Sequence, residues 1–127
     1  MTPKTHKVLI IDDDVDQLQI LSAALERDYE VLTATDGLDG YGMACAERPS
    51  VVVLDVMMPL VDGWTVLRKL RSNPLTKDTR IVIATALDRE TVADEAAHLN
   101  VSLVLRKPID LKQLKDAIGR LDASRSG

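Results

Sequence analysis

Polar side chains of the kinds that bind metal ions and phosphate stand at the ends of short apolar runs in this sequence. They are Asp12, Asp13, Asp14, Asp55, Thr85 and Lys107. The runs lie at positions 8–11, 51–54, 81–84 and 101–105 and are rich in β-branched residues, which is typical of buried strands. Because ligands of open parallel sheets collect at the carboxyl ends of the strands, we expect these side chains to converge on one edge.

The acidic residues of this set predict a metal site. Carboxylates that are held close together repel one another unless a cation compensates their charge. Mg²⁺ commonly binds one or two carboxylates together with water and phosphate oxygens, whereas a dedicated Ca²⁺ site uses more protein ligands from a loop. We therefore expect Asp12, Asp13 and Asp55 to be ligands of Mg²⁺. Asp14 is expected to cap the following helix or to face solvent.

The same edge has the parts needed for phosphoryl transfer. A carboxylate can act as a nucleophile and form an aspartyl phosphate, provided that positive charge offsets the approach of two anions. A metal ion supplies part of that charge, and the ammonium of Lys107 can supply the rest by contacting a phosphate oxygen. The hydroxyl of Thr85 can donate a hydrogen bond to another oxygen. No general base is required for this chemistry.

The segments between the runs predict helices, because apolar residues recur in them at helical spacing. The clearest stripes are Leu18, Leu21 and Leu25; Val66, Leu67 and Leu70; and Leu111, Leu114, Ile118 and Leu121. Poorer stripes predict two more helices at 36–48 and 88–99, and a more polar strand is predicted at 29–34. Near-continuous apolar strands are typical of a parallel sheet covered on both faces. The pattern predicts an α/β fold of five βα units with right-handed crossovers.

Length and charge limit the classes of function. The 127 residues suffice for one domain with its own core. The formal net charge of −4 argues against direct nucleic-acid binding, which usually needs a basic patch. The apolar runs are far shorter than the roughly 20 residues that cross a bilayer, and the beginning of the chain lacks a signal-peptide pattern. We therefore expect no membrane association and a cytoplasmic location.

Four separated motifs occur in an order that identifies a family. They are Val8-Leu9-Ile10-Ile11-Asp12-Asp13-Asp14, Leu54-Asp55-Val56-Met57-Met58-Pro59 with Asp62-Gly63 following, Ala84-Thr85-Ala86, and Arg106-Lys107-Pro108. From residue 7 to about residue 121, the sequence resembles the receiver domain of two-component response regulators. The resemblance implies a flavodoxin-like (βα)5 receiver fold with helices on both faces of a five-stranded parallel sheet in the order 2-1-3-4-5. It places a receiver domain at 5–122 and leaves 123–127 as a tail or linker remnant.

The resemblance also assigns roles to residues at the strand ends. It implies that Asp55 is the phosphoacceptor, that Asp12 and Asp13 hold Mg²⁺ with it, and that the backbone carbonyl of Met57 is a further ligand. Thr85 is the switch hydroxyl by the same resemblance, and Lys107 is the lysine that contacts the phosphate, joined to Pro108 by a bond that is often cis in the family. Residues 59–63 form the loop past the phosphoacceptor.

The resemblance further implies a phosphorylation-dependent switch rather than an enzyme. The phosphoryl group would come from the phosphohistidine of a sensor histidine kinase or a histidine phosphotransfer protein. A downstream partner or output domain would bind the face of the fourth helix, fifth strand and fifth helix, which includes Arg106, Lys112 and Lys115. The chain would be a monomer or a weak, phosphorylation-linked dimer. Val104 stands where the family usually has an aromatic residue that moves with the switch threonine, which puts that coupling in doubt.

Three other interpretations are open at this stage. Asp12 and Asp14 could serve as nucleophile and acid of a haloacid-dehalogenase-like phosphatase, although Lys107-Pro108 stands where such enzymes place further acidic ligands. A flavodoxin-like cofactor binder is disfavoured, because three aspartates would repel a flavin phosphate and the aromatic content is only 2%. A degenerate receiver that acts only as a protein-binding module is the third.

Overall fold

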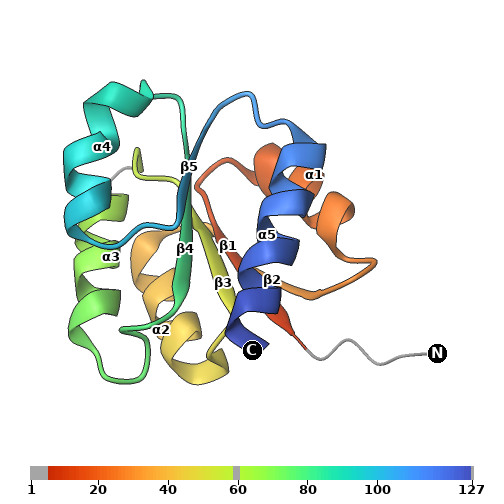
Figure 1. The fold of residues 1–127 in the computed structure, drawn as a ribbon, viewed down its shortest axis with the longest axis horizontal. Helices are drawn as coiled ribbons and strands as arrows, with labels where there is room; N and C mark the ends of the chain where they lie inside the picture. Colours follow the sequence, from red (N-terminus) through yellow and green to blue (C-terminus); the bar gives the residue numbers. More distant parts are fainter. Residues whose placement is uncertain (1–5, 59–60, 127) are drawn as a thin grey trace.

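The computed structural model describes residues 6–126 except for residues 59 and 60, which belong to the predicted loop 59–63. Strands and helices alternate along the whole chain (Figure 1). The elements are β1 (Lys7–Ile11), α1 (Val15–Leu25), β2 (Glu30–Ala34), α2 (Gly37–Glu47), β3 (Val51–Leu54), α3 (Gly63–Ser72), β4 (Arg80–Thr85), α4 (Arg89–His98), β5 (Leu103–Arg106) and α5 (Leu111–Ser126). All five predicted strands and all five predicted helices are confirmed.

The strands form one parallel sheet in the order β2-β1-β3-β4-β5, which confirms the predicted topology. Successive side chains of a strand point to opposite faces, so each central strand contributes to two cores. Val8 and Ile10 of β1 pack with α1 and α5, whereas Leu9 and Ile11 pack with α2, α3 and α4. Figure 1 shows these two groups of helices on opposite sides of the sheet. The α/β fold with both faces covered is therefore confirmed.

The ends of several elements differ from the predicted positions for local reasons. Asp36 and Asp88 precede their helices as N-caps instead of beginning them. The predicted strand 101–105 starts later, at Leu103, because the N–H of Val101 donates to Ala96 O (2.9 Å) and closes the end of α4. Asn100 has the left-handed conformation expected for a helix terminus, with a φ of 56°.

The last helix is longer than predicted. α5 continues to Ser126, four residues past the predicted domain end at position 122. The boundaries of the domain and of the tail at 123–127 stay predictions, since position 127 lies outside the described residues. In the described part of the chain, no helix is both long and apolar enough to cross a membrane.

Arg71, near the end of α3, connects three segments at the amino ends of the strands. Its guanidinium donates to the carbonyl oxygens of Lys77 (2.9 Å) and Thr79 (2.7 Å) in the loop before β4. It also donates to the carbonyl oxygens of Leu99 (2.8 Å) and Asn100 (3.0 Å) after α4. Burial lowers the pKa of Arg71 from its usual value. The side chain thus satisfies carbonyls that helix and loop ends leave without partners.

This arrangement predicts that Arg71→Lys destabilises the fold. A lysine ammonium cannot reach four carbonyls in two loops, and each hydrogen bond from a charged donor contributes about 1.5–3 kcal/mol. We expect the free energy of unfolding, measured by urea denaturation, to fall by about 2 kcal/mol or more. Arg68→Lys on the same helix is the control, because the exposed pair of Arg68 with Glu95 (3.1 Å) contributes little. Equal losses in the two variants would contradict the role of Arg71.

Candidate functional site

The carboxyl ends of β1 and β3 place two aspartates side by side. Ile11 of β1 is paired with Leu54 of β3, so the residues that follow them, Asp12 and Asp55, leave the sheet at the same level. The N–H of Asp55 donates to Ile11 O (3.0 Å), which extends the ladder to this residue. Both side chains are buried, with exposed fractions of 2% and 5%. Buried carboxylates of this kind require hydrogen bonds and compensating charge.

A backbone N–H two residues farther along orients each of these carboxylates. Asp12 Oδ1 accepts from the N–H of Asp14 (2.9 Å), and Asp55 Oδ1 accepts from the N–H of Met57 (2.9 Å). These Asx turns are local consequences of aspartate at the first position of a loop. They leave the Oδ2 atoms of both residues for other partners.

Lys107 bridges the two remaining oxygens. Its Nζ lies 2.8 Å from Asp12 Oδ2 and 3.0 Å from Asp55 Oδ2, and it reaches them from beyond β5, on the other side of β4. The N–H of Lys107 donates to Thr85 O (2.7 Å), and the Lys107-Pro108 peptide bond is cis, as the resemblance implies. The lysine is thereby attached by its backbone to the strand that lies between it and the carboxylates.

The electrostatics of this group reflect burial as well as pairing. Burial raises the pKa of Asp55 above its usual value, although the Met57 N–H and the Lys107 ammonium act in the opposite direction. Burial alone would lower the pKa of Lys107, but its hydrogen bonds to Asp12 and Asp55 and their negative charges outweigh burial and raise it. The ammonium therefore stays protonated in the folded protein.

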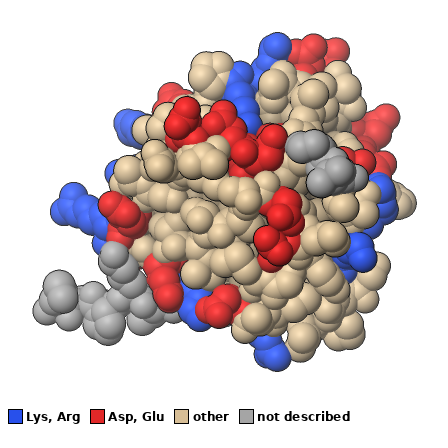
Figure 2. Space-filling model, turned by 180° about the vertical axis from the view of Figure 1, so that it is seen from behind, with Lys and Arg blue, Asp and Glu red and all other residues tan. Residues whose placement is uncertain are grey.

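Asp13 completes an acidic cluster that fits a divalent cation. One carboxylate oxygen each from Asp12, Asp13 and Asp55 lies within 4.8 Å of the others, and Asp13 is exposed to solvent. One ammonium faces these three carboxylates, so the cluster keeps excess negative charge. Hard oxygen ligands with one open side suit Mg²⁺, which keeps several waters when it binds proteins. From behind, Asp and Glu side chains also lie near the upper end of the molecule, where the strands have their carboxyl ends (Figure 2).

The structure brings together most of the residues that the sequence singles out. Thr85 ends β4 with its side chain fully buried, and its Oγ1 accepts from the N–H of Leu87 (3.2 Å). Asp14 lies outside the acidic cluster, because its side chain caps α1 by accepting from the N–H groups of Asp16 (3.0 Å) and Gln17 (3.3 Å). The predicted capping role of Asp14 is confirmed.

Gly63 has a role at the site that the sequence analysis missed. It is the first residue of α3, and a Cβ at this position would lie 2.5 Å from both Asp55 O and Val56 Cα. Its N–H donates to Val56 O (3.2 Å), and Asp62 caps the helix by accepting from the N–H of Thr65 (2.9 Å). Only glycine allows α3 to start this close to the backbone of Asp55. The sequence signal that could have indicated this close approach is the pair Asp62-Gly63, in which a glycine directly follows a residue type that often caps helices.

Comparison with known proteins agrees with this geometry. A family model for the response regulator receiver domain matches residues 8–119. The response regulator PleD of Caulobacter vibrioides is 40% identical over 105 residues, which are 82% of this chain and 23% of PleD. The probable chemotaxis protein CheY of Rhizobium etli is 35% identical over 114 residues, which are 88% of each chain. This chain therefore spans about a quarter of the length of PleD but most of the length of CheY.

A solved structure shows the same fold throughout. The crystal structure of a putative response regulator from Chloroflexus aurantiacus has a TM-score of 0.87 and 28% sequence identity, and the match covers 94% of this chain and 99% of that one. Fold, motif order and sequence similarity thus point to one family. The chain belongs to the response regulator receiver domain family and has the role of a phosphoacceptor switch in two-component signalling.

Proposed function

We propose that Asp55 is the residue that accepts the phosphoryl group, and that Lys107, Thr85, Asp12 and Asp13 assist it. The observation that supports this assignment is the bridge from Lys107 Nζ to Asp12 Oδ2 and Asp55 Oδ2, beside the exposed Asp13. The ammonium of Lys107 is close enough to Asp55 to neutralise an oxygen of a phosphoryl group bound there, which supports the assignment. Asp12 has the same kinds of hydrogen-bond partner as Asp55, so the choice of Asp55 is supported by the motif Leu54-Asp55-Val56-Met57-Met58-Pro59 around it.

The transfer step needs no proton carrier on this chain. A carboxylate oxygen of Asp55 forms a bond to phosphorus, while the bond between phosphorus and the donor histidine nitrogen breaks and its electron pair stays on that nitrogen. The N–H of Met57 holds one oxygen of Asp55 in place, so the carboxylate does not rotate freely during the attack. Lys107 then exchanges its contact with Asp55 for a contact with a phosphate oxygen.

Mg²⁺ is the cofactor that fits the acidic cluster. Asp12, Asp13 and Asp55 would hold it, and we propose the backbone carbonyl of Met57 as a further ligand. When bound, the ion neutralises negative charge on the phosphoryl oxygens and on the carboxylates. The proposal is supported by the donor chemistry of the cluster, which consists of carboxylates around an open, partly solvated side.

Thr85 is the residue that we propose to report phosphorylation to the rest of the fold. Its Oγ1 accepts a hydrogen bond from its own loop, at Leu87, so its hydroxyl proton can be donated to a phosphoryl oxygen. Val104 of β5 is half-buried against the core on the α4 side. A valine at this position has no large ring to turn inward, so we propose that movement of the loop 85–88 transmits the change.

The proposed partners follow from the family. A sensor histidine kinase or a histidine phosphotransfer protein supplies the phosphoryl group, in the cytoplasm, and a downstream protein or output domain binds the α4-β5-α5 face. Lys112 and Lys115 are exposed on this face, and Arg106 forms an exposed ion pair with Asp88 (2.8 Å) at the start of α4. This ion pair joins β5 to the loop that follows Thr85. It supports the proposal that a change at Thr85 is transmitted to the α4-β5-α5 face. We propose a monomer, or a weak dimer when phosphorylated.

The first test is phosphorylation by a small donor. We expect wild type incubated with acetyl phosphate and Mg²⁺ to gain one phosphoryl group by intact-mass spectrometry, and Asp55→Asn to gain none, because the amide is not a nucleophile. EDTA should prevent the adduct in wild type. Lys107→Ala should form the adduct more slowly, since one of the two neutralising charges is missing.

Two outcomes would contradict this assignment. An adduct that persists in Asp55→Asn but is lost in Asp12→Asn would place the nucleophile at Asp12. If wild type formed neither an adduct nor a complex with beryllium fluoride, the chain would be a degenerate receiver. Asp116→Asn, an exposed carboxylate on α5, is the matched control and should be phosphorylated like wild type.

The raised pKa of Asp55 predicts how stability depends on pH. The folded state keeps a proton on this carboxyl at pH values where the unfolded chain has lost it, so the contribution of Asp55 to stability is complete below the unfolded pKa and is lost as pH rises through the folded pKa. In EDTA at neutral pH, we expect Asp55→Asn to unfold at a higher urea concentration than wild type. The difference should shrink in acid, and a less stable variant at neutral pH would refute the charge balance described here.

Metal binding should reverse part of this difference. A cation that binds only the folded state stabilises it by mass action. Mg²⁺ is therefore expected to raise the urea midpoint of wild type and to raise that of Asp55→Asn by less, because the variant has lost a ligand. Equal shifts in both proteins would show that Asp55 is not a ligand.

The switch proposal predicts where the structure responds. Addition of beryllium fluoride and Mg²⁺ to isotope-labelled protein should move the amide resonances of residues 85–88 and of the α4-β5-α5 face. The amides of α2, which lies away from that face, should move least and serve as the internal control. If resonances of the α4-β5-α5 face stayed in place while those of Asp55 and Met57 moved, signal output through this face would be excluded.

A further inference from the structure

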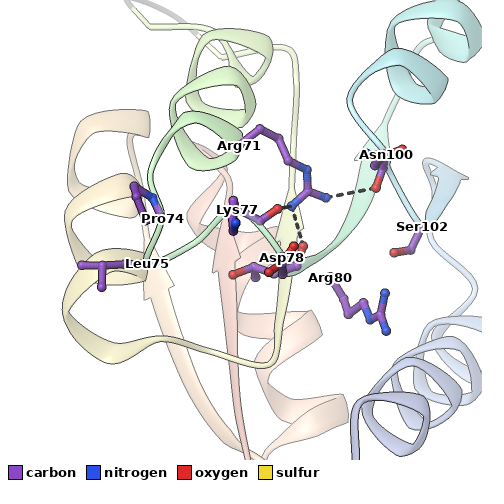
Figure 3. Close-up of a pocket in the computed structure, with 9 residues that line it drawn as sticks. Arg71, Pro74, Leu75, Lys77, Asp78, Arg80, Asn100 and Ser102 are labelled. Carbon is purple, nitrogen blue, oxygen red and sulfur yellow. Dashed lines mark hydrogen bonds between the residues drawn. The ribbon is translucent and has the colours of Figure 1, made fainter.

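A second concave region lies at the amino ends of β4 and β5, at the opposite edge of the sheet from Asp55. The loop between α3 and β4 and the loop between α4 and β5 line a half-open cavity of about 740 Å³. Figure 3 shows Arg71, Lys77, Asp78, Arg80 and Ser102 around it, contributed by the end of α3, by both loops and by the first residue of β4. A cavity of this size falls in the range of small-molecule sites.

The charge of this cavity is opposite to that of the protein as a whole. Three cationic side chains and one carboxylate, Asp78, line it, although the chain has a net charge of −4. Within the described part of the chain, neither Lys77 nor Arg80 forms an ion pair with a carboxylate. Arg80 is half-buried and Lys77 is exposed, so both keep donors for an external ligand.

Arg71 makes this edge suitable for an anion. In a parallel sheet, the helices end at the edge where the strands begin, and helix carboxyl ends expose carbonyl oxygens and partial negative charge. Here the guanidinium of Arg71 binds four carbonyl oxygens, of Lys77, Thr79, Leu99 and Asn100, and these bonds are visible in part in Figure 3. These oxygens are therefore already satisfied, and the guanidinium contributes a positive charge to the lining beside the carboxylate of Asp78.

We propose that this cavity binds a small molecule that carries two or more linked phosphate groups, with Arg80 and Lys77 contacting its oxygens. Lys77 and Arg80 stand three residues apart on the segment that leads into β4, and two neighbouring cations match a ligand with several linked anionic groups better than a single phosphate, for which the cavity is too large. Ser102 offers a hydroxyl donor on the side of β5. The lining contains no aromatic residue on which a base could stack, so recognition rests on the phosphates. The proposal does not depend on the chemistry of Asp55.

Titration with inorganic tripolyphosphate in EDTA tests the proposal. We expect saturable shifts of the amide resonances of residues 77–80 and 100–102 in isotope-labelled protein. Arg80→Gln and Lys77→Gln should each weaken binding at least about fivefold, as the loss of one charge-assisted contact implies. Arg27→Gln removes an exposed cation from the loop between α1 and β2 and should bind like wild type.

The other outcomes would overturn the proposal. Shifts scattered over many lysines and arginines, or an equal loss in Arg27→Gln, would indicate non-specific attraction. A glutamate-rich peptide that moves the same resonances where tripolyphosphate does not would make this a protein-docking surface instead. Asp55→Asn should bind tripolyphosphate like wild type, so failure of this proposal and failure of the phosphoacceptor assignment can be told apart.

Discussion

The contact of one ammonium with two buried carboxylates is the constraint on which the functional edge of this receiver domain depends. Asp12 and Asp55 are neighbours because β1 and β3 are paired with Ile11 opposite Leu54. Two buried carboxylates beside each other would be unfavourable alone. Lys107 makes the arrangement possible, and it also holds the ends of the sheet together across β4. The exposed Asp13 adds a third negative charge beside this contact. The edge therefore keeps an excess of negative charge that a bound cation can offset.

The region around this contact combines rigid and adjustable parts. The central strands are buried on both faces, and Asx turns hold one oxygen of each carboxylate. Gly63 lets α3 begin against the backbone of Asp55, which leaves little space for that residue to shift. By contrast, the hydroxyl of Thr85 accepts one hydrogen bond, from its own loop, and half-buried Val104 lies on the neighbouring strand. The side of β4, β5 and α4 is therefore the less constrained one, and it is where we propose the output face.

The two edges of the sheet differ in the charge that their side chains carry. At the carboxyl edge, loops begin with aspartates, and the excess is negative. At the amino edge, helix ends present carbonyl oxygens, and Arg71 satisfies four of them with one guanidinium. Because that guanidinium makes no ion pair among the described residues, positive charge remains there beside Arg80 and Lys77. A parallel βα fold places helix carboxyl ends at the amino edge whatever its sequence, whereas the aspartates of the carboxyl edge and Arg71 are set by the sequence.

Sequence alone determined the order of elements, the layers and the candidate residues, because burial on both faces leaves uninterrupted apolar runs and helices leave stripes. It also placed Asp14 as a cap, since capping depends on local spacing. The start of β5 was missed, because a bond from Val101 to α4 decides it, and the length of α5 was missed, because polar residues can prolong a helix without an apolar stripe. Only the tertiary structure decided that Lys107 lies between Asp12 and Asp55, that Gly63 contacts the backbone of Asp55, and that Arg71 joins two loops. Lys107 is 95 and 52 positions from the two aspartates, and even the shorter-range contacts of Gly63 and Arg71 depend on how α3 packs beside the sheet.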